Sequence, residues 1–131
     1  MNKRPTLNTQ AAVNSYSKVH YNANVESASP HGLITMLYDG AIERIAQAKG
    51  ALANNNIELK GKKINNAISI VGGLRENLDH DQGIELSHNL DALYLYIQNI
   101  LTKAHMKNDM ACLDEAAVLL SELRAAWKQI G

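Results

Sequence analysis

The chain has 131 residues, 46% of them hydrophobic, which is long enough for one compact domain that buries about two-thirds of its unfolded surface. Thirteen Lys and Arg residues balance thirteen Asp and Glu residues, and neither sign is concentrated in one segment, so binding of nucleic acid or of an acidic membrane surface is not indicated. No stretch has the ~18 consecutive apolar residues of a membrane span, and the first ten residues lack the apolar core of a secretory signal. We therefore expect a protein of the cytosol with no membrane insertion.

Cys112 is the only cysteine, so no disulfide can form within the chain, which fits a reducing compartment. It stands among apolar residues of an expected helix. We interpret it as a buried structural residue and not as a nucleophile.

Residues 1–28 are expected to form a leader that is partly helical and packs on the rest of the molecule. Ala12, Tyr16 and Val19 are spaced by four and three, which predicts a short amphipathic helix over about residues 9–20. Tyr16 and Tyr21 suit such a contact, because a tyrosine buries its ring while its hydroxyl stays in water.

Four helices are expected after the leader, over about residues 30–53, 57–78, 84–105 and 109–130. Ser29 before Pro30 is a strong helix start, the three asparagines at 54–56 interrupt the first helix, and Asn108 is the expected cap of the last. Each helix carries one apolar stripe with a spacing of three and four. The short connections make neighbouring helices antiparallel, so residues 29–131 are predicted to be an all-α, up-down-up-down four-helix bundle.

Several apolar residues fall beside these stripes, which leaves two interpretations open. The stripes are wider than this spacing indicates, or the bundle has a second, shallower apolar surface on its exterior. Gly72 and Gly73 stand in mid-helix at a cost of about 1 kcal/mol each, and they indicate either close contact with a neighbouring helix or a docking groove. The residues beside the stripes are Leu33, Met36, Leu59, Ile70, Leu95, Tyr96 and Leu119.

The sequence offers little for catalysis. Glu85 and His88 form one Glu-x-x-His pair, whereas a ferritin-like di-iron site uses two such pairs and two further glutamates. The other histidines, His20, His31, His80 and His105, stand at helix ends or in connections and are expected to be solvated caps. No phosphate-binding loop or nucleophile elbow occurs, so we expect no enzyme, no metal and no cofactor.

Three segments nevertheless resemble a known family. They are ESASPHGLITMLYDGAIERIAQAK, INNAISIVGGLRENLDHDQGIELSHNLDALYLYI and KNDMACLDEAAVLLSELRAAWKQI, and in this order they are similar to the flagellin export chaperones of the FliS family. The resemblance implies an antiparallel helical bundle that binds the disordered C-terminal segment of flagellin in exterior apolar grooves. It also implies that binding prevents premature polymerisation, and that the client is delivered to FlhA, the gate protein of flagellar type III export.

On this resemblance, the residues expected to bind the partner are Tyr16, Tyr21, Leu33, Met36, Leu59, Ile70, Leu95 and Tyr96. Two alternatives stay open beside an export chaperone. One is a metal-dependent enzyme built on a bundle, which would need more inward carboxylates. The other is a structural adaptor that forms a homodimer through the extra apolar surface.

Overall fold

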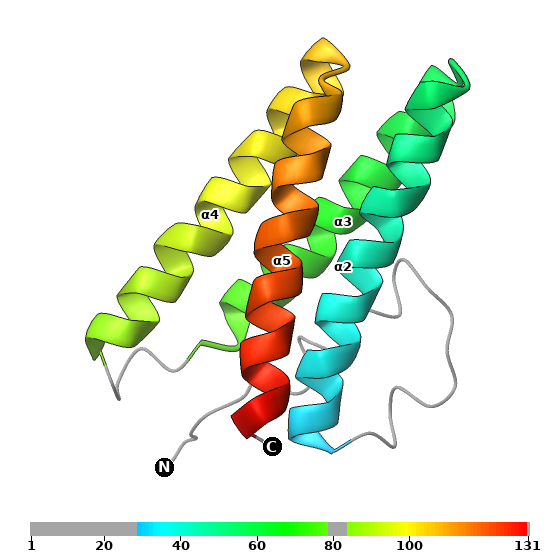
Figure 1. Ribbon diagram of the computed structural model, residues 1–131. Helices are drawn as coiled ribbons and strands as arrows, with labels where there is room; N and C mark the ends of the chain where they lie inside the picture. The colour runs from blue at the N-terminus through cyan, green and yellow to red at the C-terminus, as the bar shows by residue number, and fades with distance from the viewer. Residues whose placement is uncertain (1–28, 79–83, 131) are drawn as a thin grey trace.

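The computed structural model describes residues 29–78 and 84–130, apart from the side chains of 84–86. These residues form four helices: α2 (Pro30–Ala53), α3 (Ile57–Glu76), α4 (Ile84–Lys107) and α5 (Met110–Ile130). Figure 1 shows successive helices running in opposite directions. The predicted all-α bundle is confirmed. The leader with its expected helix, Tyr16 and Tyr21 included, lies outside the described residues.

The start of α2 follows from its cap. Ser29 has an extended backbone, and its hydroxyl accepts a hydrogen bond from the amide of Gly32 at 3.0 Å. Pro30 occupies the first helical position, where the missing N–H costs nothing. The helix ends at Ala53, and the side-chain amide of Asn54 donates to the carbonyl of Gly50 at 2.9 Å.

Asparagine side chains cap both ends of α3. Asn56 begins α3 by accepting from the amide of Leu59 at 3.1 Å. This helix ends at Glu76, two residues before the expected end, where Asn77 donates to the carbonyl of Gly73 at 2.8 Å. α4 continues to Lys107, two residues beyond the expected end.

The prediction that Asn108 caps α5 was wrong by one residue. Asp109 caps the helix, since its Oδ1 accepts from the amides of Ala111 at 3.0 Å and Cys112 at 3.4 Å. Asn108 instead has φ 52°, in the left-handed region that asparagine tolerates better than most residues. It turns the chain between α4 and α5.

The core lies between helices that each pack mainly on two others. α2 packs on α3 and α5, and α4 packs on the same two helices from the other side. The side chains of Leu37, Ile45, Ile64, Ile97 and Leu113 are among those fully enclosed. Because no Phe is present, branched aliphatic residues and Ala fill most of this space.

No helix in the described part of the chain combines the length and the apolar character needed to cross a membrane.

Candidate partner-binding surface

The predicted partner-binding residues separate into a buried and an exposed group. Leu33 is 1% exposed and Ile70 is 0% exposed, so the expectation that they lie on the exterior was wrong. Both belong to the continuous core cluster, and Met36 is partly buried against it. The reason is that a helix in this bundle faces two neighbours, which widens its buried arc beyond the stripe indicated by the spacing alone.

Leu59, Leu95 and Tyr96 are exposed on the outer surface, with exposed fractions of 37%, 42% and 44%. They do not form one patch. Leu95 lies one turn beyond Asp91 on α4, hence on the side of that helix that faces α3. Leu59 lies in the first turn of α3.

Tyr96 extends from α4 towards α5. Its hydroxyl donates to the carboxylate of Glu115 at 2.5 Å, and this hydrogen bond raises the pKa of Tyr96. The hydrogen bond fixes the direction of the ring while nearly half of the side chain stays in solvent.

In the described part of the chain, four large apolar residues are exposed that were not among the predicted ones: Ile57, Met106, Val118 and Ile130. Ile57 fits the inner stripe of α3 by its spacing, yet it stands at the first position of the helix and is 46% exposed. Val118 has a signal in the sequence, because it lies two residues after the core residue Ala116 and so points to the opposite side of α5.

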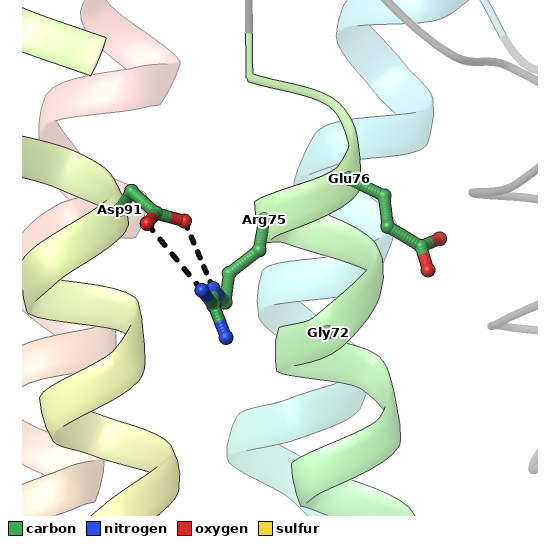
Figure 2. A pocket seen from close by; sticks show the side chains of 4 residues that line it. All are labelled: Gly72, Arg75, Glu76 and Asp91. Carbon is green, nitrogen blue, oxygen red and sulfur yellow. Dashed lines mark hydrogen bonds and ion pairs between the residues drawn. The ribbon is translucent and has the colours of Figure 1, made fainter. Parts of the chain in front are cut away.

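A groove runs between α3 and α4 beside Gly72. Its volume is about 400 Å³, and Gly72, Arg75, Glu76 and Asp91 line it. Figure 2 shows Arg75 reaching across to Asp91, while Glu76 points away from Asp91. The surface of the groove therefore carries a cation and an anion already joined to each other.

The polar side chains of this groove hold α3 and α4 together. Arg75 Nε donates to Asp91 Oδ1 at 2.9 Å, and Arg75 Nη1 donates to Gln98 Oε1 at 3.0 Å. The amide of Gln98 donates in turn to the carbonyl of Ile68 at 3.1 Å. The hydrogen bond to Asp91 raises the pKa of Arg75.

Gly72 is not required by this packing. A Cβ atom at Gly72 would meet Gln98 Nε2 at 3.5 Å, which is an ordinary contact distance. The interpretation that Gly72 allows a neighbouring helix of the bundle to approach closely therefore finds no support. A docking groove stays a prediction.

Two of the four histidines expected to be solvated caps are partly buried instead. His31 stacks on Trp127 with ring centroids 4.5 Å apart and an interplanar angle of 9°. His31 Nε2 donates to the carbonyl of Trp127 at 3.0 Å, and Trp127 Nε1 donates to the carbonyl of His31 at 3.1 Å. His105 contacts Lys60, whose Nζ donates to the carbonyl of His105 at 2.8 Å.

The described residues hold no group of three His, Cys, Asp or Glu side chains placed to bind a metal ion. His88 is exposed on α4, and the side chain of its expected partner Glu85 lies outside the described part. Cys112 is buried, as predicted, and burial raises the pKa of its thiol. A protonated thiol is a poor nucleophile.

Comparison with known proteins gives a consistent result. The family model "Flagellar protein FliS" matches residues 12–131. The chain is 45% identical to the flagellar secretion chaperone FliSB of Pseudomonas aeruginosa, over 91% of this chain and 94% of that protein. It is 37% identical to the flagellar secretion chaperone FliS of Vibrio cholerae, over 92% and 89%, and 38% identical to that of Salmonella typhimurium, over 93% and 91%. The match spans all four helices and most of both proteins in each pair, so the chain belongs to the FliS family of flagellar proteins.

Proposed function

We propose that this protein is a flagellar export chaperone of the cytosol that binds the disordered C-terminal segment of flagellin on the outside of the bundle. Support comes from its family, since the relatives compared above are named flagellar secretion chaperones. A family of chaperones is not a family of enzymes, and the alternative of a metal-dependent enzyme is set aside on that ground.

One observation supports the placement of the client most directly. Leu95 keeps 42% of its surface in solvent on the α3-facing side of α4, close to a groove where a Cβ atom at Gly72 would meet only Gln98, at ordinary contact distance. A helix in the client could lay its apolar face on Leu95, and the absent side chain at Gly72 lets a backbone come near.

The apolar contact with the client is expected at Leu95, because the groove itself is lined by three charged side chains and Gly72. Arg75 and Asp91 neutralise each other, and Glu76 leaves the groove with one net negative charge. A disordered segment that folds on binding loses conformational entropy, which a broad apolar contact must offset. Covering the apolar face of the client in this way would prevent its premature polymerisation.

Delivery to the export gate protein FlhA completes the proposal. A client held along a shallow surface can be released turn by turn, because no single deep pocket retains it.

Co-elution with flagellin tests the proposal. The purified protein should elute with full-length flagellin and should not elute with flagellin that lacks its C-terminal segment. Equal co-elution with both forms of flagellin would place the contact elsewhere on the client.

Charged substitutions test the surface. Leu95→Asp or Tyr96→Asp should weaken binding by on the order of 2 kcal/mol, because the contact would bury a charge among apolar groups. Gln47→Asp adds the same charge on the exposed side of α2 and should leave binding unchanged. Circular dichroism should show an intact helical bundle in all three variants.

Ile70 is unsuitable for this test, because a charge there would enter the core. If Leu95→Asp binds flagellin as the wild type does, the client does not use the α3-facing side of α4, and if Tyr96→Asp does so, the client does not use the α5-facing side.

A further inference from the structure

A small pit opens at the end of the bundle where α2 and α4 begin and α3 and α5 end. Its volume is about 80 Å³. Ile34, Leu74 and Leu90 contribute apolar walls, and Tyr38, Asn77 and Tyr94 contribute polar atoms. The pit is distinct from the groove beside Gly72, which lies between α3 and α4 alone.

The two tyrosines leave one hydroxyl hydrogen unused. Their hydroxyl oxygens are 2.5 Å apart, so one donates to the other. Burial raises the pKa of both Tyr38 and Tyr94, which keeps both hydroxyls protonated at neutral pH. Two hydroxyls carry two hydrogens and their mutual bond uses one, so the accepting tyrosine has a second hydrogen to donate.

Asn77 leaves an acceptor unused in the same pit. Its Nδ2 donates to the carbonyl of Gly73, which fixes Oδ1 as the other end of the amide. The residue is 6% exposed, and Oδ1 has no hydrogen-bond partner in the structure. Such an atom normally costs stability unless a donor reaches it.

Asn54 shows that capping alone does not explain this arrangement. It ends α2 with the same bond, from Nδ2 to the carbonyl four residues earlier, but Asn54 is exposed and water can satisfy its oxygen. Asn77 performs the same capping while it is buried and lines the pit, and its Oδ1 has no partner.

We propose that this pit is a binding site for a small hydroxylated molecule with a compact apolar body. The hydroxyl oxygen of the ligand accepts the unused tyrosine hydrogen, and its own hydrogen is donated to Asn77 Oδ1. The carbon atoms of the ligand contact Ile34, Leu74 and Leu90. A hydroxyl is the smallest group on a carbon body that both accepts and donates.

The size of the pit limits the ligand. A single water molecule needs about 10–15 Å³ of such volume, so about 80 Å³ exceeds what one bridging water would occupy. A branched alcohol of three or four carbon atoms fills the space and replaces water along the apolar walls.

Titration with 2-propanol and with acetone tests the proposal on the wild-type protein. The two molecules have nearly the same shape, but acetone cannot donate to Asn77 Oδ1. Trp127, the only tryptophan, lines the pit. Its indole N–H resonance in a nitrogen–proton correlation spectrum therefore reports binding. We expect a saturable shift with 2-propanol and an affinity about threefold to tenfold weaker for acetone, which is the range of one neutral hydrogen bond.

Asn77→Leu and Asn54→Leu form a matched pair, because both remove a helix-capping amide and only the first removes the acceptor in the pit. The preference for 2-propanol should vanish in Asn77→Leu and persist in Asn54→Leu. The proposal is overturned if the shift grows linearly without saturation, if both probes bind equally to the wild type, or if Asn77→Leu keeps the preference. If Asn77→Leu does not fold, the difference in affinity between 2-propanol and acetone on the wild-type protein is sufficient to test the proposal.

Discussion

Lys60 and Gly61 form a contact that local sequence did not predict. Lys60 is 1% exposed, and its Nζ donates to the carbonyl of His105 in the last turn of α4, where the helix dipole favours a cation. Its Nζ also lies 3.3 Å from His105 Nδ1, so that ring nitrogen accepts. A Cβ atom at Gly61 would lie 2.7 Å from Cε1 of the same ring. Gly61 therefore gives the imidazole its space.

Alanine at two glycines separates this contact from helix propensity. Gly50→Ala, where a Cβ meets nothing within 4 Å, should raise the free energy of unfolding by about 1 kcal/mol. Gly61→Ala should instead lower it by about 1 kcal/mol, because the ring of His105 must leave Lys60 to avoid the new carbon atom. Urea unfolding followed by circular dichroism measures both. An equal gain in both variants would show that the ring moves aside at no cost.

Asp109 gives a pH dependence with a definite sign. Hydrogen bonds from the thiol and the backbone amide of Cys112 lower the pKa of Asp109 from its ordinary value of 3.8. A carboxylate with a lowered folded-state pKa stabilises the folded protein fully above its unfolded-state pKa, and the effect is lost as the pH falls through the folded-state value. We expect wild type to be more stable than Asp109→Asn near neutral pH.

This difference should shrink in acid, below the ordinary pKa of the aspartate, because the wild-type side chain is then protonated as well. Urea unfolding of the two proteins at both pH values makes the comparison. A difference that stays constant with pH would mean that the charge of Asp109 does not support the cap.

At the scale of the helices, spacing and caps were sufficient to predict much of the bundle. The caps at Ser29 and Asn56 and the apolar stripe of α2 depend only on neighbours within one or two turns. The local sequence pattern is therefore sufficient to predict them. Leu33 and Ile70 were placed wrongly because the width of a buried arc depends on where two other helices pack. Lys60, His31 and Tyr96 make their contacts across the bundle, which spacing along one helix does not encode.

Gly72→Ala tests whether the client binds in the groove beside α3. The new Cβ would be at ordinary contact distance from Gln98, so the substitution should stabilise the free protein by about 1 kcal/mol through helix propensity. It should also weaken the binding of flagellin, because the carbon atom occupies the groove. Urea unfolding measures the gain in stability, and co-elution measures the loss of flagellin binding.

Gly50→Ala is the control for Gly72→Ala, since it offers the same gain in propensity on α2, away from the groove. It should stabilise the protein and leave binding unchanged. Unimpaired binding by Gly72→Ala would remove the groove beside Gly72 from the path of the client.

At the scale of the whole molecule, α2 and α5, the first and last described helices, pack side by side along a seam of paired side chains. His31 and Trp127 join the first turn of α2 to α5 by stacking and by two reciprocal hydrogen bonds. Ion pairs between Arg124 and Asp39, and between Lys49 and Asp114, continue the same seam, although exposed pairs of this kind contribute little. The groove beside Gly72 lies between α3 and α4, the other two helices of the bundle. A client can therefore dock there while the seam between α2 and α5 stays closed.

The central claim is that flagellin binds through its C-terminal segment to the outer surface of α3 and α4. Calorimetric titration of the protein with that isolated segment tests it most directly. We expect one saturable binding event whose heat capacity change is negative, as burial of apolar surface requires, and whose affinity falls in Leu95→Asp but not in Gln47→Asp. Absence of binding by the isolated segment, or equal affinities of the two variants, would contradict the account.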